Sequence, residues 1–313
     1  MRIIFMGTPE FAVPSLQALI EKEFNVVAVI TATDKPAGRG NKLITSAVKD
    51  CALKYQIPVL QPEKLKSPEF LEELRSYQAD LQIVVAFRML PEVVWNMPKY
   101  GTFNLHASLL PQYRGAAPIN WAIIEGETET GLTTFFLEHE IDTGKIIFQE
   151  REAILPEDDF GALYAKLMQK GGDLVVKTVQ AIIDGNYPQV PQDNTQPIKL
   201  APKIFKETCA IDWSKSTVEI HNFVRGLSPI PAAWTTLLGK NCKIFKTKLD
   251  TSFQPENTQK GASDGLTYLT DNKKFLYLQT SDGYLSVEEL QLEGKKRMDI
   301  RSFLAGNKME VLK

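Results

Sequence analysis

The chain is poor in the residues that build metal sites and disulfide frameworks. Its 313 residues include three cysteines and three histidines. Cys51, Cys209 and Cys242 lie far apart in the sequence and form no C-x-x-C pair, so neither a zinc site nor a disulfide framework has its ligands. This cysteine usage is typical of a reducing compartment, and we expect a cytoplasmic protein that binds no metal.

Long apolar runs and an excess of charge of one sign are also lacking. No stretch approaches the roughly 20 apolar residues of a membrane span, and the apolar N-terminus is too short for a signal peptide. The chain has 36 Lys and Arg and 38 Asp and Glu, a net charge of −2. That balance argues against capture of nucleic acid by the whole surface, although it permits a local basic patch. We expect no association with membranes.

Strand and helix signals alternate in the first 150 residues. Strands that are apolar almost throughout and separated by helices indicate a parallel sheet covered on both faces. Ligands of such sheets bind beyond the carboxyl ends of the strands. The predicted strands are 3–6, 26–31, 81–87, 102–105, 132–137 and 146–149, and the predicted helices are 14–23, 46–55 and 68–77.

The second half of the chain predicts a different architecture. A long amphipathic helix covers about 158–184, and the four prolines between 188 and 203 indicate an extended linker. Closely spaced strands then suggest a small β-barrel. We therefore predict a catalytic domain at 1–187, a linker at 188–206 and a barrel domain at 207–313. Within the barrel domain we expect a helix at 217–227 and strands at 233–238, 242–249, 266–269, 275–280 and 284–291.

One short motif carries the candidate chemistry. Asn104 and His106 come at the end of a predicted strand, where residues i and i+2 point to the same face, and Pro111 and Gly115 then turn the chain. Asp142 follows a later strand within Asp-Thr-Gly. An isolated Asn-x-His is usually an ordinary strand end. An amide, an imidazole and a carboxylate brought together would form a donor, an acid–base group and an orienting group.

The motif and its surroundings resemble a known family. Asn-x-His-x-Ser-Leu-Leu-Pro at 104–111 and Ile-Asp-Thr-Gly at 141–144 are similar to the signature of formyltransferases that use 10-formyltetrahydrofolate. Further similar segments lie at 5–13, 35–40, 114–119, 211–214 and 294–296, so the resemblance extends over nearly the whole chain. It implies a Rossmann-like α/β domain with a parallel sheet, followed by a small OB-like β-barrel domain.

The resemblance also implies a reaction. In the branch of the family that the chain resembles, the acceptor is the α-amine of methionine esterified to initiator tRNA, and the product serves translation initiation. Asn104 and a protonated His106 would donate hydrogen bonds to the oxyanion that forms on the formyl oxygen. Asp142 would orient His106, support its charge and help to move protons, through water.

The resemblance implies a folate pocket around this trio. Two positions depart from the family pattern: residues 84–91 are one residue shorter than usual, with Arg88 in the glycine region, and Glu140 stands where glycine is usual. The expected folate-binding residues are Phe87, Arg88, Met89, Leu90, Ser108, Leu109, Leu110, Pro111, Glu138 and Glu140.

Two groups of cations are candidates for binding tRNA. The Gly/Pro-rich stretch 33–43 would on its own be an ordinary solvated loop, but in the family it contacts the acceptor end, with Arg39 as the principal contact. Charge runs in the barrel domain are usually solvated faces, yet barrels of the OB type track nucleic-acid backbones. The candidates are Lys35, Arg39 and Lys42 in the first group and Lys243, Lys246, Lys248, Lys295 and Lys296 in the second.

Other interpretations remain open from the sequence. The acceptor could be an amino sugar on a nucleotide, the same trio could hydrolyse formyl-folate, or an inactive α/β domain could serve an RNA-binding protein. The 35–40 loop and the barrel domain argue against a small acceptor. A nucleotide-binding protein is disfavoured, because the loop at 7–10 contains neither G-x-G-x-x-G nor a Walker lysine. The expected partners are initiator methionyl-tRNA and formyl-folate, and we expect a monomer.

Overall fold

The computed structural model describes residues 1–37, 42–250 and 258–311, and its chain divides into two compact units that interleave along the sequence. The first unit comprises Met1–Gly115, Thr130–Ala153 and Tyr164–Leu200. The second comprises Ala116–Glu129, Ile154–Leu163 and Ala201–Lys313. Two short segments from the first 163 residues therefore fold with the C-terminal region. The domain boundaries at 187 and 207 stay a prediction.

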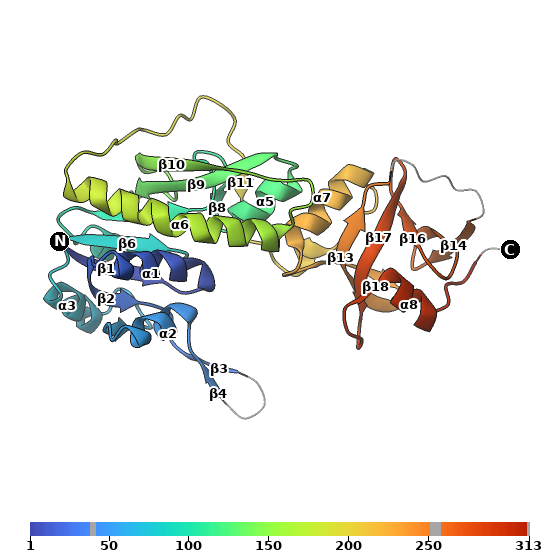
Figure 1. Ribbon diagram of the computed structural model, residues 1–313, viewed down its shortest axis with the longest axis horizontal. Coiled ribbons are helices and arrows are strands. Elements are labelled where there is room, and N and C mark those ends of the chain that lie inside the picture. The colour runs from blue at the N-terminus through green and yellow to red at the C-terminus, as the bar shows by residue number, and fades with distance from the viewer. Residues whose placement is uncertain (38–41, 251–257, 312–313) are drawn as a thin grey trace. The chain divides into compact units, whose positions relative to one another are not determined.

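A seven-stranded sheet forms the centre of the first unit (Figure 1). Neighbours from β7 through β6, β1 and β2 to β5 run parallel, whereas β9 runs antiparallel to β7. The predicted α/β domain with a parallel sheet is confirmed, and the departure is confined to the β9 side. In spatial order the strands are β10 (Ile146–Ala153), β9 (Glu129–Phe136), β7 (Thr102–His106), β6 (Leu81–Val85), β1 (Arg2–Gly7), β2 (Asn25–Ile30) and β5 (Val59–Leu60).

Local signals fix the ends of the helices in this unit. Ser46 and Ser67 cap two of them, each hydroxyl accepting a hydrogen bond from the backbone N–H three residues later. Proline within the first two positions starts two helices, where its missing N–H costs nothing. The predicted helices are confirmed to within a few residues as α1 (Val13–Glu21), α2 (Ala47–Lys54), α3 (Pro68–Ser76) and α6 (Phe160–Ile183), the last from Tyr164 onward within this unit. The short helix α4 (Glu92–Trp95) and the 3-10 turn η1 (Glu10–Ala12) are not among the predicted helices.

The long helix α6 packs closely against α1 and strand β7. A Cβ added at Gly171 would lie 2.9 Å from Leu105 Cδ2, and one at Gly172 would lie 3.1 Å from the Pro14 carbonyl oxygen. The glycine pair thus allows α6 to approach both elements. Leu105, which faces this helix, alternates with Asn104 and His106 along β7, so the packing leaves those two side chains on the other face.

A curled antiparallel sheet builds most of the second unit, which confirms the OB-like architecture. Its strands follow the order β12-β13-β17-β16-β15-β14, and β18 pairs with β17. Sequence reasoning missed β14, whose Gln-Lys-Gly-Ala-Ser sequence has little strand propensity. The strands are β12 (Ala233–Leu237), β13 (Lys240–Lys248), β14 (Gln259–Ser263), β15 (Leu266–Thr270), β16 (Leu276–Gln279), β17 (Tyr284–Leu292) and β18 (Met298–Asp299).

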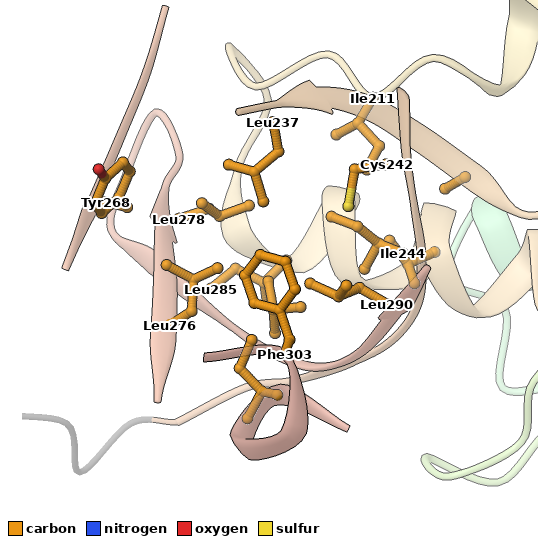
Figure 2. Packing of buried hydrophobic residues seen from close by; sticks show 14 of the residues in the cluster. Ile211, Leu237, Cys242, Ile244, Tyr268, Leu276, Leu278, Leu285, Leu290 and Phe303 are labelled. Carbon is orange, nitrogen blue, oxygen red and sulfur yellow. The ribbon is translucent and has the colours of Figure 1, made fainter. Parts of the chain in front are cut away.

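The sheet wraps around an apolar core shown in Figure 2. Phe303, from the short helix α8 (Ile300–Gly306), is fully buried among leucines of the surrounding strands. Helix α7 (Thr217–Leu227) coincides with its predicted range and begins with a capping box between Ser216 and Glu219. It packs on α5 (Pro118–Ile124), where the Asn120 amide donates 2.8 Å to the Gly226 carbonyl oxygen. A 3-10 turn, η2 (Glu207–Cys209), precedes α7.

Two small sheets complete the described chain. Strands β3 (Lys35–Ala37) and β4 (Lys42–Ile44) form an antiparallel hairpin, and β8 (Arg114–Gly115) pairs with β11 (Leu200–Ala201). The base of the hairpin is fixed by Lys49 Nζ, which lies 2.5 Å from Asp34 Oδ2 and 2.7 Å from Gln61 Oε1. Across the described ranges, no helix combines the length and apolar character that crossing a bilayer requires.

Candidate active site

The end of β7 places the first two residues of the trio. The strand lies between β6 and β9, with Asn104 opposite Val84 and Phe135 and His106 opposite Thr133. Because side chains alternate along a strand, Asn104 and His106 project from the same face, as predicted. Asn104 is half-buried, and within the described residues nothing hydrogen-bonds its amide, so both of its N–H groups are available to a ligand.

The orientation of His106 is set by a backbone group. Its Nε2 lies 2.9 Å from the carbonyl oxygen of Tyr113, and the residue is 6% exposed. A carbonyl oxygen only accepts, so Nε2 carries a hydrogen and donates it. The nitrogen left for chemistry is therefore Nδ1. Tyr113 presents its carbonyl from a left-handed conformation, with φ of 60°.

Asp142 lies beside the free nitrogen of His106. Its Oδ2 is 3.9 Å from His106 Nδ1, too long for a direct hydrogen bond but close enough for charge attraction. The same oxygen accepts a 2.9 Å hydrogen bond from the backbone N–H of Gly115. Only 13% of the Asp142 side chain and 7% of the His106 side chain are exposed, which reduces screening by water. Two side chains 36 positions apart in the sequence thus lie within range of charge attraction.

This arrangement can stabilise a developing oxyanion and move a proton. Asn104 offers uncharged donors, and a protonated His106 offers Nδ1–H, with the Asp142 carboxylate 3.9 Å from the same nitrogen. The Tyr113 carbonyl, which sequence reasoning missed, contacts the His106 ring as well. The orienting and charge-supporting role of Asp142 stays a prediction.

Two residues of the segment that follows β7, Ser108 and Leu110, are buried and take part in hydrogen bonds within the protein. Ser108 is fully buried, and its hydroxyl donates 2.6 Å to the Gln112 carbonyl oxygen. Leu110 is also buried, and the Gln149 amide donates 2.9 Å to its carbonyl oxygen. Leu109 and Pro111 are half-buried. Of the four predicted folate contacts here, the latter two have side-chain surface for a ligand.

The segment after β6 contains the family departure at Arg88. This side chain reaches residues 62 and 63: its Nη1 donates 3.0 Å to the Glu63 carbonyl oxygen, and Nη2 donates to that of Pro62. The guanidinium therefore ties two loops together. Leu90 is buried in the core beneath α3, whereas Phe87 is half-buried and Met89 is 73% exposed.

The loop before Asp142 is open to solvent. Glu138 and Glu140 are exposed, and the Glu140 carbonyl oxygen accepts a 3.0 Å hydrogen bond from the Thr143 hydroxyl. The carboxylate of Glu140 therefore takes no part in closing this turn. Ile141, next to Asp142, is 58% exposed. A ligand that covered the loop would meet the apolar side chain of Ile141, the imidazole of His139 and two acidic side chains.

The predicted tRNA contacts fall on the two units separately. In the first unit, Lys35 is exposed on β3, Lys42 lies in β4, and Arg39 lies outside the described residues. In the second unit, Lys243, Lys246 and Lys248 are exposed along β13, where bulges beside Lys246 bring all three outward. Lys295 and Lys296 are exposed in the turn after β17. Glu289, opposite Lys246, is bound instead by Arg297 at 2.6 Å.

Comparison with known proteins identifies the family of this chain. A formyl transferase domain matches residues 1–179, and a formyl transferase C-terminal domain matches residues 203–308. The chain belongs to the formyl transferase family. It is 54% identical over 309 residues to the methionyl-tRNA formyltransferase of Bacteroides fragilis, which covers 98% of this chain and 95% of that one. A second relative of the same name, from Parabacteroides distasonis, is 55% identical over 98% of this chain and 96% of its own.

Solved structures with lower identity share the fold. HypX from Aquifex aeolicus, in complex with tetrahydrofolic acid, matches with a TM-score of 0.62 and 19% identity over 97% of this chain and 47% of HypX. This chain thus spans about half the length of HypX. An N-formyltransferase from Helicobacter canadensis, in complex with folinic acid and dTDP-3-aminofucose, matches with a TM-score of 0.64 and 22% identity over 95% of this chain and 99% of that one.

Proposed function

We propose that the protein transfers the formyl group of 10-formyltetrahydrofolate to the α-amino group of methionine esterified to initiator tRNA. One observation carries this proposal: both formyl transferase domains are present, and the chain is 54% identical over 98% of its length to a methionyl-tRNA formyltransferase. An acceptor as large as tRNA also gives a use to the exposed lysines of β13 and to the β3–β4 hairpin. Cytoplasmic location and a monomeric state remain predictions.

The trio supports a direct displacement at the formyl carbon. The amine nitrogen forms a bond to that carbon, negative charge builds on the formyl oxygen, and the bond to the folate nitrogen then breaks. Asn104 and Nδ1–H of His106 would donate to the charged oxygen, and loss of one such donor typically costs about 10²–10³ in rate. Nε2 cannot serve, because it already donates to Tyr113.

One proton must leave the amine and one must reach the folate nitrogen. A model α-amine has a pKa near ~7.7–8, so part of it is already neutral at pH 7 and no strong base is needed. His106 can pass a proton through Nδ1, and Asp142 at 3.9 Å stabilises the imidazolium that forms in between. The folate serves as a co-substrate, and Phe87, Met89, Leu109 and Pro111 have the side-chain exposure to contact it.

The proposal is tested by following tetrahydrofolate release from 10-formyltetrahydrofolate. We expect rapid release with methionyl-tRNA, little with a nucleotide-linked amino sugar and little with water alone. Uncharged tRNA is the matched control, because it can bind but has no amine to accept the formyl group. Release that is equally fast without any acceptor would identify a hydrolase and overturn the proposal.

Arg39 provides a test of tRNA recognition. Arg39 lies in the sequence between β3 and β4, whose base is held by Asp34, Gln61 and Lys49, and the planar donor fork of arginine suits phosphates and bases. We expect Arg39→Ala to raise KM for methionyl-tRNA by about tenfold or more, because one or two charge-assisted hydrogen bonds are lost. KM for the folate should be unchanged. Arg75→Ala, at an exposed arginine on α3, is the control. Equal increases in both KM values would contradict the assignment.

The β13 lysines provide a second test, through salt dependence. Each phosphate contact that is lost should reduce the slope of log Kd against log salt by about one. We expect the triple variant Lys243→Gln, Lys246→Gln, Lys248→Gln to bind tRNA more weakly at low salt and to show a flatter slope. The same change at Lys54, Lys64 and Lys66, which are exposed on the first unit, is the control. An unchanged slope in the β13 variant would remove these lysines from the tRNA surface.

A further inference from the structure

A glutamine in the predicted linker contacts the loop that carries Asp142. Gln192 Nε2 donates 2.8 Å to the Asp142 carbonyl oxygen and 2.9 Å to the Gly144 carbonyl oxygen. Asp142 itself has a left-handed backbone, with φ of 56°, which is unfavourable for a residue with a side chain. One amide group therefore satisfies two carbonyls of a strained turn.

The amide of Gln192 has only one favourable orientation. Its Oε1 accepts from Arg114, at 3.1 Å from Nε and 2.5 Å from Nη2. If the amide were reversed, its oxygen would face two carbonyl oxygens and its NH₂ would face the guanidinium. Both contacts would then be repulsive. Arg114 thus makes Gln192 a donor toward the Asp142 turn.

These contacts close a ring around the carboxylate. Arg114 precedes Gly115, whose N–H donates 2.9 Å to Asp142 Oδ2. The side chain of Asp142 is therefore bound by the Gly115 N–H, and its backbone carbonyl is bound by Gln192. Gln192 is bound in turn by Arg114. The flanking chain is fixed as well, because Val190 and Ile146 exchange backbone hydrogen bonds of 2.8 and 2.9 Å.

We propose that Gln192 is a positioning residue, which holds Asp142 in its catalytic orientation through a backbone contact whose polarity is set by Arg114. The inference rests on the proposed function, since it assigns Asp142 a role in formyl transfer. It also gives part of the predicted linker a role at the site, because Gln192 lies within the first unit and contacts the Asp142 turn.

The kinetic test separates the donor role from simple anchoring. Gln192→Ala removes both hydrogen bonds. We expect kcat to fall about 10- to 100-fold, because a displaced catalytic group costs a factor of this size. The KM values for methionyl-tRNA and folate should stay within about twofold of the wild-type values. Gln192→Glu still pairs with Arg114 but cannot donate to the carbonyls, so it should lose at least as much. Near-normal activity of Gln192→Glu would show that anchoring to Arg114 suffices and would overturn the proposal. Asp193→Ala, at the exposed neighbouring residue, is the control.

A double-mutant cycle and an exchange measurement complete the test. If Gln192 acts only through Asp142, Gln192→Ala should change kcat less than about twofold in an Asp142→Asn background. Amide hydrogen exchange in the 140–146 segment should be faster in Gln192→Ala than in Asp193→Ala and the wild type. Unchanged exchange, or full additivity with Asp142→Asn, would reject the positioning role. Because exchange is measured without substrates, it tests this role even if the protein fails to formylate methionyl-tRNA.

Discussion

Asp142→Asn is expected to lower kcat for formyl transfer by about 10²–10⁴-fold, the usual contribution of a positioned acid–base group. The substitution keeps the shape of the side chain, and the remaining oxygen can still accept from the Gly115 N–H. It removes the negative charge 3.9 Å from His106 Nδ1, so the imidazolium is no longer stabilised. The fold should be unaffected. Among the described residues, His106 is the one whose ion pair involves the Asp142 charge.

The measurement is steady-state kinetics with methionyl-tRNA, together with thermal unfolding to verify the fold. Asp173→Asn, at an exposed position on α6, is the matched control and should behave as the wild type. Full activity of Asp142→Asn would show that proton movement does not use this carboxylate. A large drop in melting temperature would instead indicate a structural role.

Gly144→Ala is expected to reduce kcat by about 10²-fold and to lower the melting temperature as well. A Cβ at this position would lie 1.7 Å from the Phe136 carbonyl oxygen and 2.9 Å from its carbonyl carbon. Both atoms are backbone within β9, so they cannot move aside, and overpacking of this kind typically costs about 1–3 kcal/mol. The turn must shift instead, and Asp142, which lies two residues before Gly144, would move with it.

The control for this variant is Gly306→Ala. An added Cβ there meets nothing within 4 Å, so activity and melting temperature should stay at wild-type values. Circular dichroism and kinetics on the same preparations would distinguish a displaced loop from an unfolded protein. A Gly144→Ala variant with wild-type kcat would mean that the turn tolerates displacement and that Asp142 does not need its observed position.

The fold could be predicted where local patterns agree with tertiary structure. The apolar strands β1 and β6 and the capped helices α3 and α7 carry their own signals. Strand β14 carries none. Its Gly261 is needed because a Cβ would lie 2.3 Å from the Tyr268 ring and 2.2 Å from the Glu310 carbonyl oxygen, a contact between distant segments. The reversed direction of β9 is likewise a property of the assembled sheet.

The candidate reacting side chains could be named from the sequence, but the groups that hold them could not. Asn104 and His106 share a face by strand periodicity alone. His106 is held by the Tyr113 carbonyl oxygen and Asp142 by the Gly115 N–H, and such backbone groups occur all along the chain, so the sequence contains no signal for these two contacts. Gln192 could have been suspected only as a polar residue in a Pro-rich segment, which has the composition of a linker.

The departure at Arg88 shows the opposite case. Resemblance to the family marks it as unusual in a segment predicted to bind folate, but its guanidinium is bound to the carbonyls of residues 62 and 63. Its hydrogen bonds therefore connect two loops of the protein. Contact between Arg88 and the folate stays a prediction, and the structure adds that any such contact would compete with these bonds.

The most direct test of the account is the fate of an isotope-labelled formyl carbon. The protein is incubated with labelled 10-formyltetrahydrofolate, initiator methionyl-tRNA and a nucleotide-linked amino sugar together, and the products are separated by mass spectrometry. The account predicts that the label appears on the α-nitrogen of methionine esterified to tRNA. Label found mainly on the amino sugar, or released as formate, would contradict it.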